Sequence, residues 1–208
     1  MLIMKLLQKC VFALVFLGCS FILKAGVEPS VSIRSQKGES FSLHLIDMNK
    51  EPFDIQLSDQ FGVILIKEKV KDQDDYLKFY NLKELATGNY TMRIESDRRI
   101  IFQPILFNKE NRSIEISAKK EIYKPALKFV YPHLDLNMLH FEEGTVDIRI
   151  LDKVGYTLYK DELISEGSIT KRYGVTTLPA GNYLFLISTK DYTYEQAFSI
   201  SSDNITGH

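Results

Sequence analysis

This chain has no large excess of charge of either sign, no tryptophan and only two cysteines. Its 26 basic and 27 acidic residues give a net charge of −1 and are interleaved, without a basic stripe. Binding to nucleic-acid phosphates needs such a stripe, so we expect no nucleic-acid partner. Tryptophan is absent, and the two cysteines, Cys10 and Cys19, lie within the first 25 residues. An intrachain disulfide is therefore excluded for the rest of the chain.

A long uncharged run lies at the N-terminus. Lys5 and Lys9 precede the run Val11–Leu23, and small residues follow it. A basic start, an apolar stretch and a small-residue exit predict a secretory signal peptide over residues 1–25. The run is shorter than the roughly 20 apolar residues of a bilayer span, but a retained membrane anchor is the alternative. Exported eukaryotic domains are usually rich in disulfides, so a cysteine-free mature chain indicates a bacterial host.

Cys19 offers a second interpretation of this segment. The sequence Phe16-Leu17-Gly18-Cys19 resembles a bacterial lipobox, in which the cysteine receives a lipid and becomes the new N-terminus. We therefore expect an exported protein that is periplasmic or secreted, or alternatively an outer-membrane lipoprotein anchored through Cys19. Membrane association is expected only if Cys19 is lipidated or the signal segment is retained.

The remaining chain repeats itself with an offset of 93 residues. Residues 54–103 align without a gap with residues 147–196, and fourteen of these fifty pairs are identical. Average residue usage would give roughly three identities. Two copies of one unit are therefore predicted, with bounds 27–117 and 126–203, joined by a short charged linker at 118–125.

Alternating apolar side chains predict strands within each unit. Phe41, Leu43 and Leu45 are separated by single residues that are mostly polar, and a period of two is typical of a strand with one buried face. Pro104 interrupts a later strand, which indicates a bulge or an edge position. Short strands between regular turn signals, without helical periodicity, predict an all-β chain of two tandem Ig-like antiparallel β-sandwiches.

Two turn motifs occur once in each unit. Asp59–Gly62 and Asp152–Gly155 have Asp first and Gly fourth, which predicts a type I turn capped by the Asp side chain, with a left-handed Gly. The second motif is a Leu-x-x-Gly-Asn-Tyr corner, where we expect Gly at positive φ and a buried Tyr whose hydroxyl returns to the corner backbone. The residues of this corner are Leu85, Gly88 and Tyr90 in the first unit and Leu178, Gly181 and Tyr183 in the second.

This order of elements resembles a known class of module. A strand, an Asp-x-x-Gly turn, an alternating strand and the corner Leu178–Tyr183 are similar to small Ig-like modules of exported bacterial envelope proteins. Among these are the C-terminal sorting modules of type IX secretion and short secreted Ig-like proteins. The resemblance covers most of residues 145–200 and is looser in the first unit; it implies a non-enzymatic envelope protein. Sorting modules usually end in a basic strand, whereas residues 197–204 contain no Lys or Arg.

Sequence patterns that support catalysis or cofactor binding are missing. No Gly-x-Ser-x-Gly elbow, HExxH helix motif or paired Cys-His cluster occurs. We therefore predict no enzyme, no cofactor and no metal. Two groups contain atoms that bind metals but are interpreted as solvated surface. They are the strand row His133, Asp135 and Asn137 and the acidic loop Asp72, Asp74 and Asp75.

Contact with other molecules is expected at strand edges. Unpaired backbone groups there can accept a strand from a partner, so we predict protein partners and an interaction role. Glycan binding is the alternative, because sugars stack on exposed aromatic rings, and a secretion sorting module is a second alternative. The rings available for stacking are Tyr123, Tyr131, Tyr156, Tyr159, Tyr192 and Tyr194.

Overall fold

Every regular element of the described chain is a β-strand. The computed structural model describes residues 30–46, 48, 50–140, 144–164, 167–190, 192–202 and 204–208. The predicted signal segment 1–25, with Cys19, lies outside these residues. Within them, no helix has the length and apolar character to cross a membrane. The all-β prediction is confirmed.

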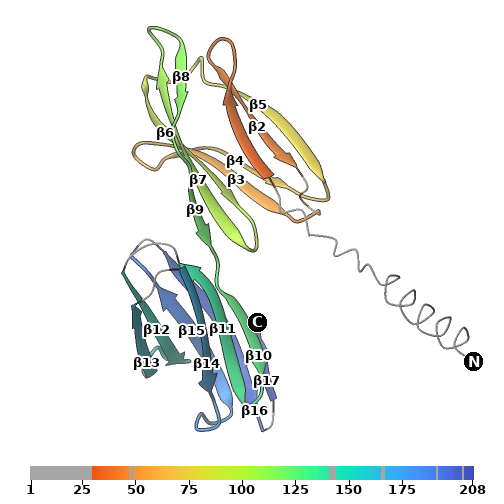
Figure 1. The fold of residues 1–208 in the computed structure, drawn as a ribbon, viewed down its shortest axis with the longest axis vertical. Helices are drawn as coiled ribbons and strands as arrows, with labels where there is room; N and C mark the ends of the chain where they lie inside the picture. Colours follow the sequence, from red (N-terminus) through yellow and green to blue (C-terminus); the bar gives the residue numbers. More distant parts are fainter. Residues whose placement is uncertain are drawn as a thin grey trace, which may run out of the picture.

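The first unit is a sandwich of two antiparallel sheets (Figure 1). One sheet has the strand order β1-β2-β5, and the other has the order β4-β3-β6-β7-β8, with β9 also paired to β7. The strands are β1 (Ser30–Ser35), β2 (Ser40–Ile46), β3 (Phe53–Asp59), β4 (Ile64–Val70), β5 (Asp75–Asn81), β6 (Gly88–Glu95), β7 (Arg99–Asn108), β8 (Ser113–Ile116) and β9 (Lys120–Tyr123).

The second unit has the same topology. Its sheets have the orders β10-β11-β14 and β13-β12-β15-β16-β17. The strands are β10 (Ala126–Val130), β11 (His133–His140), β12 (Thr145–Asp152), β13 (Thr157–Ile164), β14 (Gly167–Gly174), β15 (Gly181–Ser188), β16 (Thr193–Ser201) and β17 (Asn204–Gly207). The prediction of two tandem sandwiches is therefore confirmed.

The 93-residue offset of the sequence holds in the backbone. β15 begins and ends 93 residues after β6, and β13 begins 93 residues after β4. In constant-type immunoglobulin domains the fourth strand joins the sheet of the first two strands. Here β4 and β13 pair with the third strand of their unit instead. Both copies share this departure, so it belongs to the repeated unit.

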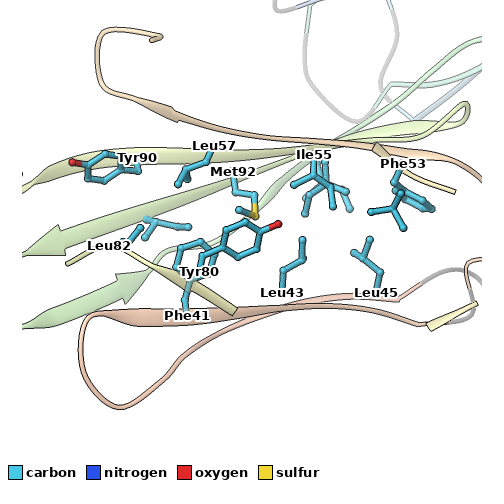
Figure 2. Close-up of a cluster of buried hydrophobic side chains, with 14 of the residues drawn as sticks. Phe41, Leu43, Leu45, Phe53, Ile55, Leu57, Tyr80, Leu82, Tyr90 and Met92 are labelled. Atoms are coloured by element: carbon cyan, nitrogen blue, oxygen red, sulfur yellow. The ribbon is translucent and has the colours of Figure 1, made fainter. Parts of the chain in front are cut away.

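Each unit has its own core between its two sheets. In the first unit, Phe41 and Leu43 of β2 face Leu57 of β3 across the sandwich (Figure 2). In the second unit, Leu134 of β11 and Phe185 of β15 belong to a separate cluster. All five side chains are completely buried. The period-two alternation in the sequence places them on the inner faces of the sheets.

The predicted linker at 118–125 contains a strand. β9 pairs antiparallel with the first half of β7, Arg99–Phe102, while β8 pairs with the second half, Ile105–Asn108. The backbone groups of β7 are thereby hydrogen-bonded along most of its length. This pairing accounts for the part of the linker that forms β9 against the first unit. Pro104 lies between the two halves. β7 is therefore not an edge strand, and the missing N–H of Pro104 falls where neither β8 nor β9 pairs with it.

The second unit also extends past its predicted end at residue 203. β17 pairs with β16 from Ser201↔Asn204 to Phe198↔Gly207, and Ile205 is buried in the second core. Its counterpart β8 ends the main sheet of the first unit. Both strands have four residues, which is too short for a recognisable period of two.

The two long sides of each sandwich differ. On one side β1 lies against β8, and β10 lies against β17. On the other side β4 and β5, like β13 and β14, are the last strands of their sheets and share no backbone ladder. We call this the open side. Its strands leave one row of backbone N–H and C=O groups without a ladder partner in the described chain.

Candidate functional site

The tyrosines of the repeated corner are buried and hydrogen-bonded. The hydroxyl of Tyr90 donates to the carbonyl oxygen of Ala86 at 2.7 Å, and that of Tyr183 donates to Pro179 at 2.5 Å. Burial raises the pKa of both tyrosines. Two further corner side chains pack against the cores, Leu85 and Leu178. The corner side chains therefore face inward and support the fold.

The expectation of a positive φ at Gly88 and Gly181 is wrong. Glycines with positive φ include Gly62 (80°) and Gly155 (92°), whereas Gly88 and Gly181 are absent from this class. The chain already turns at residues 83–85, so both glycines begin the extended strands β6 and β15. A Cβ added to Gly181 would lie 3.6 Å from the ring of Tyr183, which is an ordinary contact.

The Asp-x-x-Gly turns are capped by their aspartates, as predicted. The Oδ1 atoms of Asp59 and Asp152 each accept two backbone N–H groups of their own turn at 2.9 Å. These side-chain bonds hold the tip of each hairpin in one conformation. The same tips expose large apolar side chains, namely Phe61, Val63, Val154 and Tyr156.

Open edges and exposed apolar side chains coincide on the two hairpins. β4 exposes Ile64 and Leu65 to 51% and 40%, and β13 exposes Leu158 and Ile164 to 47% and 85%. β4 pairs only with β3, and β13 pairs only with β12, among the described strands. We define residues 61–70 and 154–164 as the two hairpin edges. Each edge combines unpaired backbone groups with apolar surface, which is the composition of a strand-addition site.

An ion-paired cluster bridges the open side of the first unit. Glu68 of β4 accepts hydrogen bonds from Lys78 Nζ at 2.5 Å and from the hydroxyl of Tyr80, both on β5. Desolvation raises the pKa of Glu68, but these hydrogen bonds outweigh it and hold the pKa below its ordinary value. Burial and the bond to Glu68 raise the pKa of Tyr80. The hydroxyl of Tyr76 is buried without a hydrogen-bond partner in the described chain.

The second unit repeats the cluster 93 residues later. Asp161 of β13 accepts Lys171 Nζ at 2.8 Å and the hydroxyl of Tyr173 at 3.2 Å. The bond from Lys171 lowers the pKa of Asp161, and burial followed by the charge of Asp161 raises the pKa of Tyr173. Our sequence analysis missed these clusters. The signal was available, because the lysine and the tyrosine are identical pairs at this offset and the carboxylate is retained.

The strand row His133, Asp135 and Asn137 lies on β11. Nδ1 of His133 is buried without a hydrogen-bond partner in the described chain, whereas the other two side chains are hydrogen-bonded. Asp135 forms two hydrogen bonds with Arg172, at 2.6 and 2.9 Å, and Asn137 accepts a bond from Thr170. The bond from Arg172 lowers the pKa of Asp135. In the described part of the chain, no group of three or more His, Cys, Asp and Glu side chains could hold a metal ion.

The acidic loop before β5 is exposed. Asp75 forms a hydrogen bond with His44, with 2.7 Å between Oδ1 and Nε2, and the backbone carbonyl of Asp74 accepts the N–H of Met48. Asp72 adopts a left-handed φ of 55°. The side chains of all three aspartates lie at the surface. The loop thus makes local structural contacts at its C-terminal end.

Only two of the six tyrosines considered for sugar stacking are exposed. Tyr156 is 72% exposed and Tyr159 is 43% exposed, and the ring of Tyr159 packs edge-to-face against Tyr173 with centroids 5.7 Å apart. Tyr156 lies in the hairpin turn before β13, Tyr159 lies within β13, and a bulge in the ladder lies between them. The partly buried rings are Tyr123, Tyr131, Tyr192 and Tyr194. Tyr156 is therefore the most exposed of the six rings.

Comparisons with known proteins give little further information. No family model matches this chain, and no curated protein matches it. A solved structure described as a biofilm-associated protein, BSP domain, is 11% identical, with 83% of this chain and 29% of that chain covered and a TM-score of 0.28. A likeness at this level does not establish a shared fold. The resemblance to type IX sorting modules gains no support from a family match.

Proposed function

We propose that this protein is a non-enzymatic, exported envelope protein whose two sandwiches form a structural and protein-interaction module. Its contact surface is the pair of hairpin edges. The observation that carries the proposal is that both units leave the same strand edge open and place large apolar side chains on it. Native proteins usually cover or blunt such edges, and exposed apolar surface is typical of interaction sites.

The state of the acidic side chains supports a structural role over a catalytic one. Glu68 and Asp161 each bind a lysine and a tyrosine across the open side, and Asp135 binds Arg172. Their pKa values are lowered, which keeps them ionised. A general acid requires the opposite shift, and a base needs a reactive group within reach. These carboxylates act as crosslinks within the sandwiches.

The cellular location follows from the N-terminal segment and is part of the proposal. Processing near Ala25 would give a periplasmic or secreted protein, and lipidation of Cys19 would give an outer-membrane lipoprotein. Mass spectrometry of the mature N-terminus distinguishes the two. A start at Gly26 or Val27 supports the soluble form, and a lipid-modified Cys19 supports the anchored form. An N-terminus at Met1 would contradict processing.

Site-specific photo-crosslinking in the producing organism tests the interaction role. A photoreactive amino acid replaces Leu65 on β4 or Leu158 on β13, and as a control it replaces Leu106. Leu106 is 38% exposed, close to Leu65, but lies on the interior strand β7. We expect discrete protein adducts from at least one hairpin edge and none from Leu106. Equal or absent crosslinking at all three positions would contradict the proposal.

Glycan binding is the second candidate, because Tyr156 presents most of its ring to solvent at a hairpin tip. Tyrosine fluorescence of the purified protein is followed during titration with common envelope sugars. Saturable binding that is lost in Tyr156→Ala would favour this candidate over protein interaction. Tyr194→Phe is the control, because the ring of Tyr194 packs against the second core.

A further inference from the structure

We infer that β13 is a self-pairing edge, through which two copies of this chain associate by antiparallel strand addition centred on Asp161. The inference rests on the proposed function and names the occupant of the second hairpin edge as a second copy of the chain. β13 lies at the rim of its sheet (Figure 1), with its outer backbone groups unpaired in the described chain.

The outward face of β13 has a self-complementary pattern. Alternate exposed residues on this face run basic, acidic, apolar: Lys160, Glu162 and Ile164. A bulge at Leu158 ends the regular alternation on the N-terminal side. In an antiparallel pair centred on residue 161, Lys160 lies opposite Glu162 of the second copy. By symmetry each contact forms twice. Opposite charges placed directly across two strands stabilise the pairing.

The neighbouring registers of the same pair are unfavourable. A slip by one residue turns the outward face of one strand against the inward face of the other. A shift that places residue 160 at the centre puts two lysines opposite each other, and a shift to residue 162 puts two glutamates opposite each other. Like charges in directly opposed positions destabilise a strand pair. Like-charge repulsion therefore disfavours the registers next to the one centred on residue 161.

Among the described residues, Glu162 shares its nearest cation, Lys160, with Asp147. It lies opposite Asp147 of β12 in the strand register. Lys160 is 3.1 Å from Asp147 but 3.8 Å from Glu162, so this lysine serves two carboxylates and is closer to Asp147. Lys160 of a second copy would give Glu162 a partner. Pairing also covers Ile164, which at 85% exposure is the most exposed large apolar side chain in the described chain.

On the inward face of β13, the proposed pairing brings the two copies of Asp161 together at its centre. Asp161 would lie opposite Asp161 of the second copy, which alone would be repulsive. Each carboxylate, however, already binds Lys171 at 2.8 Å and Tyr173 at 3.2 Å. The negative charge is thus paired within each chain before the strands meet.

The equivalent edge of the first unit cannot self-pair in this way. The positions equivalent to Lys160, Glu162 and Ile164 are all basic: Lys67, Lys69 and Lys71. A pair centred on residue 67, 68, 69 or 70 places lysines opposite each other. Exposed lysines are a common means of protecting an edge strand from self-association. Only the second unit is therefore expected to dimerise.

Sedimentation velocity over a concentration series tests the inference. The chain is expressed with its own N-terminal segment and purified in processed form. A single pair of edge strands covers less than the roughly 1,200–2,000 Å² of a standard interface, so we expect a monomer–dimer equilibrium with a dissociation constant on the order of ten micromolar. Lys160→Glu and Glu162→Lys should each weaken association at least about tenfold, because like charges replace both pairs.

Mixing the two charge-reversed proteins is the decisive measurement. In the mixed pair every carboxylate again faces an ammonium group, so association should return to within about threefold of the parent. The control is Lys109→Glu, the same charge change at an exposed residue of the first unit, which should leave association unchanged. The inference would be overturned by a parent protein that stays monomeric at about 200 µM, roughly twenty times the expected dissociation constant. A mixture that fails to associate would also overturn it.

The outcome also separates this inference from the proposed function. A monomeric parent whose crosslinks at Leu158 contain a different protein would remove self-pairing and leave the interaction role intact. Adducts with twice the mass of the chain at Leu158, but not at Leu65, support both. Absence of crosslinks at both hairpin edges, together with a monomeric parent, would contradict both.

Discussion

The two hairpin edges have the same backbone and different surfaces. β4 and β13 hold equivalent places in their sheets, and both direct a carboxylate inward to a lysine and a tyrosine, Glu68 in one unit and Asp161 in the other. Their outward faces differ: β4 presents lysines, whereas β13 presents Lys160 beside Glu162. The contacts between the two sheets are thus retained in both copies, and the copies differ on the outward faces of their edge strands.

The neighbouring strands β5 and β14 show the same division. β5 exposes Leu77 and Phe79 to 54% and 61%. The equivalent residues of β14 are Thr170 and Arg172, which bind Asn137 and Asp135 of β11. The outer face of the first unit is therefore apolar where that of the second is polar. Two units of one topology present two different surfaces.

The largest expected effect separates the two cores. Phe41 is completely buried and stacks on Tyr80, with ring centroids 5.1 Å apart. Phe41→Ala should destabilise the first unit by about 3–5 kcal/mol and leave the second unit unchanged, because their buried clusters share no residue. Leu134→Ala, at the equivalent position, should do the reverse. Hydrogen exchange resolved by peptide measures each unit; joint loss of protection would show that they unfold as one body.

The carboxylate clusters should differ in strength between the units. Glu68→Ala removes the acceptor of Tyr80, which is only 2% exposed. The nearby hydroxyl of Tyr76 already has no hydrogen-bond partner in the described chain. We expect a loss of about 1–3 kcal/mol in the first unit, and a smaller loss in the second for Asp161→Ala. Urea unfolding of both variants gives the comparison. An equal loss of stability in the two variants would contradict the expectation that the more buried cluster of the first unit contributes more.

The same clusters predict a dependence on pH. The folded-state pKa values of Glu68 and Asp161 lie below their ordinary values of 4.5 and 3.8, so the unfolded chain binds more protons in this range. Their stabilisation is therefore complete above these ordinary values and is lost as the pH falls through the folded-state values. Urea midpoints measured between pH 7 and pH 3 should fall less steeply in Glu68→Ala than in the parent.

The smallest expected effect contrasts two kinds of glycine. Gly62→Ala and Gly155→Ala should each cost about 1–2 kcal/mol, because an L-residue is strained at their positive φ. Gly88→Ala and Gly181→Ala should cost nothing measurable or stabilise by about 0.5 kcal/mol, since both are extended and an added Cβ finds room. Thermal unfolding distinguishes the two pairs. A loss at Gly88 equal to that at Gly62 would contradict this assignment.

Local patterns were predicted well, and pairing across the chain was predicted less well. The alternation around Phe41, the capped turn at Asp59 and the Tyr90 hydroxyl all involve residues within a few positions of one another, so short-range rules describe them. β9 and β17 were missed because four-residue strands carry no clear period. The positive φ expected at Gly88 was wrong because the chain completes its turn before that residue.

The candidate site depends on contacts that no single strand reveals. Glu68 and Tyr80 lie on strands at the edges of different sheets, and their sequence shows only an ordinary acidic residue and an ordinary tyrosine. The repeat could have indicated their pairing, since both positions are retained 93 residues later. The openness of β4 and β13 could not be read locally, because it depends on which strand lies at the rim of the finished sheet.

The sequence by itself determined the duplicated unit, the strand period and the turn chemistry, because these follow from side-chain alternation and local backbone preference. Only the tertiary structure decided that the fourth strand joins the sheet of the third and that β13 stands open at its rim. It also brought Glu68 to Tyr80 and Asp161 to Tyr173 across the open side of each sandwich. The order of strands in a sheet depends on hydrogen bonds between segments far apart in the chain, and the local sequence of one segment does not show which strand it will pair with.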